Sequence, residues 1–167
     1  MVDKVKIAVD AMGGANSPRK IIDGIEISLK SSNDNMFYLY GKNDLLEKEI
    51  SKKKHIKKYC EIIHTDDVIL DDESPLAAAK RSKNTSMWKA VESLKDKKSH
   101  ICLSAGNTGA LLVISRLLLK TITGISKPAL AALWPNQNNM NVVLDLGANI
   151  ECNEKNLVDF ACMGSAL

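Results

Sequence analysis

Residues 101–119, ICLSAGNTGALLVISRLLL, contain the pattern that decides the fold. The run Ile101–Ser104 has the length and composition of a buried strand, and a glycine-rich turn follows it. Residues Thr108–Leu119 are apolar almost all round, which is typical of a helix packed on both sides. The stretch therefore predicts a strand, a glycine-rich loop and a buried helix in direct succession.

The same alternation of strand and helix runs along the rest of the chain. Val5–Asp10 is a short apolar run, and apolar residues between Ile21 and Leu29 then recur at helical spacing. Further strands are expected at Met36–Tyr40, Tyr59–His64, Ala129–Trp134 and Asn141–Leu146, and further helices from Asp44 to about Lys54, around Met87–Leu94 and over Leu157–Leu167. Because parallel strands need a crossover to return to the same edge, these units predict an α/β fold with a mostly parallel sheet, covered by helices on both faces, in a single domain.

Composition indicates a globular protein without a metal centre. The chain has 167 residues, 45% of them apolar, and its net charge of +3 is too small to indicate nucleic-acid binding. The apolar segment Ala110–Ile125 contains Arg116 and Lys120 and falls short of the ~20 residues of a membrane span, so we expect a soluble, cytoplasmic protein. The cysteines form no C-x-x-C pair and the histidines have no ligand spacing, which argues against a metal site. Cys60 and Cys102, in strand-like runs, are expected to be small core residues.

Polar and glycine-rich residues follow the first strand and the strand that ends at Ser104. Ligands of parallel sheets bind at the carboxyl ends of the strands. Asp10 is followed by Gly13 and Gly14, which let backbone N–H groups approach an anion, although a tight turn alone would explain them equally well. The second group comprises Ser104, Gly106, Asn107, Thr108 and Gly109. Its place at a helix start suits phosphate, and the alternative is that Asn107 or Thr108 only caps the helix.

Two further segments carry similar chemistry. Asp145, with Gly147 and Asn149 behind it, is a lone carboxylate at the end of an apolar strand, and ligand contact and loop bracing are equally good explanations. Lys83 and Ser86 belong to a segment of cations and hydroxyls, residues 80–86, which could hold an anion or simply form a solvated helix entry. No complete G-x-G-x-x-G, phosphate-binding P-loop or G-x-S-x-G motif occurs, so neither nucleotide binding nor a serine hydrolase is indicated.

Four stretches taken together resemble the phosphate acyltransferase (PlsX) family. They are IAVDAMGG at 7–14, SAGNTGAL at 104–111, KPAL at 127–130 and VVLDLGAN at 142–149. The resemblance covers essentially the whole chain, although Ala15 stands where the family usually has Asp and family members continue well beyond Leu167. It is therefore a resemblance to the N-terminal part of a single acyltransferase domain.

The resemblance implies a three-layer, Rossmann-like α/β/α fold, similar to that of phosphotransacetylases and isopropylmalate dehydrogenases, and a homodimer. It implies transfer of a long-chain acyl group from acyl carrier protein to inorganic phosphate without a cofactor. The acyl phosphate would serve a membrane glycerol-3-phosphate acyltransferase, so a peripheral location at the inner face of the membrane is a further expectation.

Phosphate is itself the nucleophile in such a reaction, so the protein must position two reactants and stabilise a developing oxyanion. We expect Asn107 and the backbone of 106–109 to supply oxyanion donors, and Asp10 or Asp145 to accept the remaining proton of phosphate or to orient a cation. Phosphate would be bound by Gly13, Gly14, Lys83, Ser86, Ser104, Gly106, Thr108, Gly109, Gly147 and Asn149.

Two alternative functions remain open at this stage. One is a short-chain phosphotransacetylase that uses coenzyme A, and the other is a fragment that binds phosphate without turnover. The basic run Lys52–Lys58 is either a solvated helix end or a patch for acidic carrier protein or anionic lipid.

Overall fold

The computed structural model describes residues 4–32, 34–81 and 83–167, with the Arg81 side chain left out. The chain divides into two compact units, residues 1–119 and 120–167, and each is described by itself. The expectation of a single domain therefore stays a prediction. Among the described residues, no helix has both the length and the apolar character that would let it cross a bilayer.

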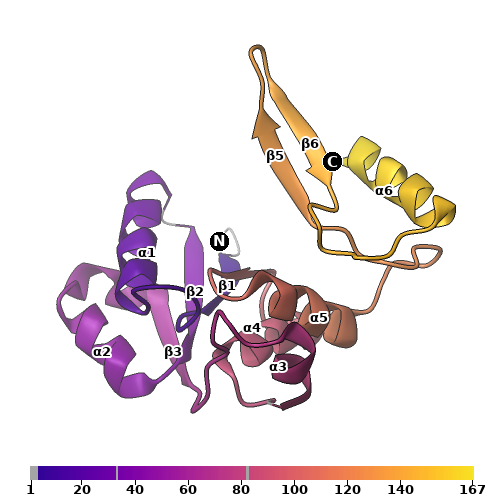
Figure 1. Cartoon of the computed structure of the whole chain (residues 1–167). Helices are drawn as coiled ribbons and strands as arrows, with labels where there is room; N and C mark the ends of the chain where they lie inside the picture. Colours follow the sequence, from indigo (N-terminus) through magenta and orange to yellow (C-terminus); the bar gives the residue numbers. More distant parts are fainter. Residues whose placement is uncertain (1–3, 33, 82) are drawn as a thin grey trace. The chain divides into compact units, whose positions relative to one another are not determined.

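The first unit is a parallel sheet flanked by helices (Figure 1). Its four strands lie in the order β3-β2-β1-β4 and all neighbours are parallel, which confirms the predicted sheet. Its elements are β1 (Val5–Asp10), α1 (Arg19–Ser31), β2 (Asn35–Gly41), α2 (Asn43–Ser51), the 3-10 helix η1 (Lys54–Tyr59), β3 (Cys60–His64), α3 (Pro75–Arg81), α4 (Ser86–Lys95), β4 (Ile101–Ser104) and α5 (Thr108–Leu119).

Side chains of β1 alternate between the two faces of this sheet. Ile7 and Val9 belong to the core that also contains the buried residues of α1 and α2. Ala8 packs with Ala90 of α4 on the opposite face. Asp10, two residues beyond Ala8, therefore points to the α4 side, and this orientation positions the candidate site.

The helix expected from Asp44 to about Lys54 is interrupted. α2 ends at Ser51, and η1 begins at Lys54. Ile56 lies six positions after Ile50, so an unbroken α-helix would place the two side chains about 120° apart around its axis. The interruption allows both side chains to reach the same core, where Ile56 is fully buried.

The helix predicted at Thr108–Leu119 is present as α5, and its packing is described within the first unit alone. Ala110 and Ile114 are fully buried, in a cluster with residues of α3 and α4. Leu117 and Leu119, in contrast, are 58% and 42% exposed. Within the first unit, one face of the helix is packed, and the other carries apolar side chains that no described residue of this unit covers.

The second unit contains an antiparallel hairpin and one helix. β5 (Ala131–Pro135) and β6 (Met140–Leu144) pair antiparallel, and α6 (Glu154–Ala166) follows. Both strands were expected, but the connection of residues 136–139 is too short for the crossover that a parallel pair requires. The Asn136 side chain closes this turn by accepting hydrogen bonds from the backbone N–H groups of Asn138 at 2.9 Å and Asn139 at 2.6 Å.

The cysteines of β3 and β4 behave as packed residues. Burial raises the pKa of Cys60 to about 11. Burial, with a smaller contribution from the Asp10 charge, raises the pKa of Cys102 to about 12. The thiolate is the reactive form of cysteine, so both thiols are poor nucleophiles near neutral pH.

We expect iodoacetamide at pH 8 to modify the exposed Cys162 more than ~10-fold faster than Cys60 or Cys102, because the two strand thiols stay protonated. Mass spectrometry of peptides from a timed reaction measures the three rates. Labelling of Cys102 as fast as that of Cys162 would mean that its thiol is activated.

Candidate functional site

Asp10 is the centre of a buried polar cluster at the carboxyl ends of β1 and β4. The side chain is 1% exposed and accepts hydrogen bonds from the hydroxyls of Ser86, at 2.5 Å, and Ser104, at 2.7 Å. Ser86 begins α4 and Ser104 ends β4. One carboxylate thus joins three elements that are far apart in the sequence.

The glycine-rich turns after β1 and β4 lie against each other above this carboxylate. A Cβ atom on Gly13 would overlap the Asp10 carboxylate and lie 2.9 Å from the Gly106 nitrogen. Gly14 has φ +81°, and a Cβ there would overlap the carbonyl oxygen of Ala105. The Gly106 N–H donates to the Ser104 hydroxyl at 3.1 Å. The two predicted anion-binding turns are therefore a single structural feature.

Asn107 forms hydrogen bonds that hold backbone in place. Its Oδ1 accepts from the Ala110 N–H at 2.9 Å, the geometry of a helix cap. Its Nδ2 lies within hydrogen-bonding distance of the carbonyl oxygens of Leu70 (3.3 Å), Asp71 (3.1 Å) and Glu73 (2.9 Å). These contacts support the capping alternative, and they engage the Asn107 amide donors with backbone carbonyls.

Replacement of Asn107 by alanine is expected to lower the free energy of unfolding by about 1–2 kcal/mol, because α5 loses its cap and loop 70–73 loses its tether. Urea unfolding measures the change. Thr108→Ala, at an exposed position on the same turn, is the matched control and should have a much smaller effect. Equal stabilities for Asn107→Ala and the unsubstituted chain would contradict this role.

The other predicted residues of this turn have different surroundings. Thr108 is exposed. Gly109 lies against α3, and a Cβ there would lie 2.6 Å from the Pro75 side chain. Ser86 directs its hydroxyl inward to Asp10, whereas Lys83, in the preceding turn, is exposed. Ser82, in the same predicted anion-binding segment, lies outside the described residues.

Asp145 and its loop belong to the second unit. Asp145 has φ +56°, and its Oδ1 accepts from the backbone N–H of Asn149 at 3.1 Å and from its Nδ2 at 2.7 Å. Asn149 also donates to the carbonyl of Pro128 at 2.8 Å, and Gly147 has φ +78°. These contacts agree with the bracing alternative. The predicted role of Asp145, Gly147 and Asn149 in ligand binding stays a prediction.

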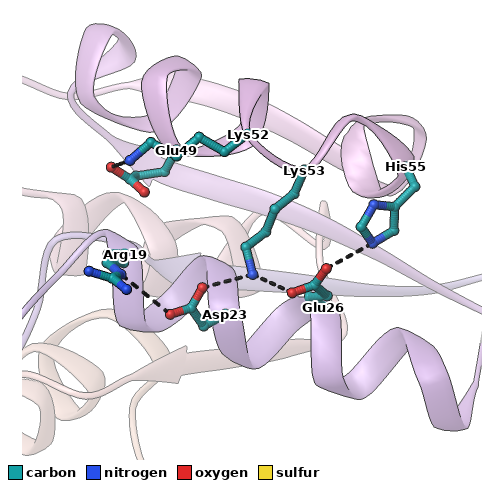
Figure 2. Close-up of polar contacts among 7 residues, drawn as sticks. All are labelled: Arg19, Asp23, Glu26, Glu49, Lys52, Lys53 and His55. Atoms are coloured by element: carbon teal, nitrogen blue, oxygen red, sulfur yellow. Dashed lines mark hydrogen bonds and ion pairs between the residues drawn. The ribbon is translucent and has the colours of Figure 1, made fainter.

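The basic run is partly neutralised by acidic residues of α1 (Figure 2). Lys53 contacts Asp23 at 2.8 Å and also Glu26, and its hydrogen bonds lower the pKa values of both carboxyls. His55 lies 3.0 Å from Glu26. Lys52 pairs with Glu49, while Lys54, Lys57 and Lys58 are exposed.

The sequence does not reveal the hydrogen-bond partners of two predicted site residues, Ser86 and Asn107. The Ser86–Asp10 hydrogen bond spans 76 positions, and the contact of Asn107 with loop 70–73 spans more than 30. A helix start, at Ser86, and a strand end, at Asp10, were each visible as local patterns. Their meeting depends on α4 packing across β1, which a local pattern does not specify.

Comparison with known proteins places these features in context. A family model described as "Fatty acid synthesis protein" matches residues 5–167. A phosphate acyltransferase of Pelagibacter ubique is 58% identical over 98% of the chain and 48% of the relative. A relative of the same name from Xanthobacter autotrophicus is 41% identical over 100% of the chain and 47% of its own length. Another, from Caulobacter vibrioides, is 40% identical over 99% of the chain and 46% of its own length. The chain thus spans about half the length of these curated relatives.

Proposed function

The chain belongs to the fatty acid synthesis protein family, and we propose that it contributes part of the active site of an enzyme that transfers an acyl group to inorganic phosphate. The observation that carries the proposal is the pair of glycine-rich turns closed over Asp10 at the strand ends. Anions bind where backbone N–H groups converge at such turns and at helix starts. The shared name of the curated relatives supports phosphate as the acceptor.

Donors for phosphate or for the oxyanion come from the backbone at the start of α5. Asn107 directs its amide to loop 70–73, and the Gly106 N–H contacts Ser104. The first N–H groups of a helix have no intrahelical partner, which leaves those of Thr108 and Gly109 for an anion. We therefore assign the electrostatic stabilisation to backbone groups of 108–109, with the helix dipole adding a partial positive charge.

We propose that Asp10 receives a proton through Ser104. The carboxylate is buried, and Ser104, only partly buried, donates to it at 2.7 Å. A phosphate O–H can donate to the Ser104 oxygen while the Ser104 proton moves to Asp10, so that charge on the nucleophile increases as it attacks the thioester carbon. The acyl–sulfur bond then breaks and the thiolate leaves. In this scheme Ser104 contacts the phosphate, and Asp10 accepts the proton.

The acyl donor and the partners remain part of the proposal. We propose acyl carrier protein as the donor, with coenzyme A thioesters as the alternative, and the exposed Lys54, Lys57 and Lys58 as a surface suited to an acidic partner. We further propose that the enzyme is a homodimer and that it lies in the cytoplasm at the inner membrane face. There it would deliver acyl phosphate to a membrane glycerol-3-phosphate acyltransferase. Lys83 is exposed and is proposed to bind phosphate at the edge of the site.

Acyl phosphate formation tests the function. The chain and the complete Pelagibacter relative are each supplied with phosphate and with long-chain acyl carrier protein, long-chain acyl coenzyme A or acetyl coenzyme A. We expect the relative to prefer acyl carrier protein and this chain alone to be inactive. Preference of the relative for acetyl coenzyme A would support the phosphotransacetylase alternative instead.

A second function, phosphate binding without turnover, rests on the same glycine-rich turns at the strand ends. Isothermal titration with phosphate distinguishes it from complete inactivity. In an active enzyme that contains this chain's sequence, Lys83→Ala should raise the KM for phosphate more than the KM for the acyl donor. Equal changes in both constants would remove Lys83 from the phosphate site.

A further inference from the structure

The two oxygens of the buried Asp10 carboxylate have different surroundings. Oδ2 accepts the Ser104 hydroxyl at 2.7 Å and faces the glycine-rich turns, since a Cβ on Gly13 would overlap it and a Cβ on Gly106 would lie 3.5 Å from it. Oδ1 accepts the Ser86 hydroxyl at 2.5 Å. The carboxylate therefore presents one oxygen to the strand-end turns and the other to the start of α4.

Ser86 is fully buried, and backbone contacts hold it in place. Its N–H donates to the carbonyl of Asp67 at 3.1 Å, and Asp67 forms a parallel bridge with Thr85. The Thr85 side chain caps α4 by accepting the Trp88 N–H at 3.2 Å. The segment after β3 and the helix cap thus fix the position from which the Ser86 hydroxyl reaches Asp10.

Burial makes the orientation of this carboxylate depend on its donors. Asp10 is 1% exposed and Ser86 is 0% exposed, so bulk water does not replace a hydroxyl that is lost at Oδ1. Two hydroxyls that donate to different oxygens fix the plane of the carboxylate, whereas a single donor leaves it freer to turn about the Cβ–Cγ bond. The alignment of Oδ2 with Ser104 therefore depends on Ser86.

We propose that Ser86 is a positioning residue for proton transfer, which acts through Asp10 and does not contact phosphate. Its hydroxyl holds Oδ1, so that Oδ2 stays aligned to receive the Ser104 proton while the phosphate proton moves to the Ser104 oxygen. The proton of Ser86 stays on its own oxygen throughout. The role in proton transfer rests on the proposed function, whereas the alignment of Asp10 by Ser86 does not.

Kinetic measurements separate a positioning residue from a phosphate ligand. In an active enzyme that contains this chain's sequence, Ser86→Ala should lower kcat by on the order of 100-fold, because a misplaced reacting group costs about that factor. The KM for phosphate should stay nearly unchanged, since the lost hydrogen bond is not made to the substrate. Ser86→Thr keeps the hydroxyl and Ser86→Cys replaces it by a weaker donor, so kcat should fall in the order Thr, Cys, Ala. If Ser86→Ala does not fold, the order of the other two variants makes the same test.

Ser93→Ala is the matched control, because it removes a buried hydroxyl from the same helix. Ser93 is 3% exposed, shares a 2.5 Å hydrogen bond with Ser99, and lies about 10 Å along the helix axis from Ser86. Its loss of stability in urea should be similar to that of Ser86→Ala, whereas its kcat should match that of the unsubstituted enzyme. Equal falls in kcat for the two variants, or a higher phosphate KM with unchanged kcat for Ser86→Ala, would overturn the proposal.

Hydrogen exchange of the chain alone tests the alignment without acyl transfer. The Gly106 N–H donates to the Ser104 oxygen at 3.1 Å, so Ser86→Ala should speed its exchange more than Ser93→Ala does. Equal exchange of the Gly106 amide in the two variants would overturn the proposal. An unsubstituted enzyme that forms no acyl phosphate would overturn the proposed function and the role in proton transfer together, and the exchange result would then decide the alignment by itself.

Discussion

Replacement of Asp10 by alanine is expected to lower the free energy of unfolding of the first unit by about 3 kcal/mol. The substitution leaves the buried Ser86 hydroxyl and the partly buried Ser104 hydroxyl without their acceptor, and an unsatisfied buried donor costs about 1–3 kcal/mol. Removal of a buried charge offsets part of this loss, since ionised carboxylates are costly to bury. The hydrogen-bond loss is the larger effect because both donors converge on one group.

Trp88 fluorescence during urea unfolding measures this change. Trp88 is 7% exposed in the first unit, and the chain's other tryptophan, Trp134, is 59% exposed in the second, so a Trp134→Phe background isolates the signal. Asp34→Ala, at an exposed loop position, serves as the control and should change stability by less than ~0.5 kcal/mol. A loss for Asp10→Ala no larger than that of the control would contradict the central role of the carboxylate.

Local patterns in the sequence were sufficient to predict the strands and most of the helices of the first unit. Apolar runs marked β1, β2, β3 and β4 to within a residue or two, and their alternation with helices predicted the parallel order. The break before η1 was missed because the sequence between Ile50 and Ile56 is uniformly polar. Burial of Ile56 decided that break, and burial is a property of the packed core.

The sequence indicates which residues lie at the candidate site better than it indicates what each of them contacts. Asp10 and Ser104 follow from the rule that ligands bind at strand ends, and the structure brings them together. The sequence suggests Ser86 as a phosphate ligand, whereas in the structure its hydroxyl donates to Asp10, because the turn into α4 points it toward the sheet. The sequence suggests Asn107 as an oxyanion donor, whereas its amide contacts carbonyls of a loop more than 30 residues away in the sequence.

Alanine at Gly14 is expected to destabilise the first unit by about 3 kcal/mol or more. The residue has φ +81°, a conformation that costs a residue with a Cβ roughly 1–2 kcal/mol. The new Cβ would also overlap the Ala105 carbonyl oxygen, a backbone atom that cannot move without separating the turns after β1 and β4. The strain and the overlap act together, so the loss should exceed that from φ alone.

Gly24→Ala is the matched control for this substitution, because it adds the same methyl group to the same unit. Gly24 lies within α1, and its new Cβ would meet no atom within 4 Å. Glycine in a helix interior costs about 0.5–1 kcal/mol relative to alanine, so Gly24→Ala should stabilise the unit by that amount. Urea midpoints in the Trp134→Phe background should therefore move in opposite directions for the two variants. If Gly14→Ala retained the stability of the unsubstituted chain, the turns after β1 and β4 would not be in contact, and the single anion-binding feature proposed at the strand ends would have to be abandoned.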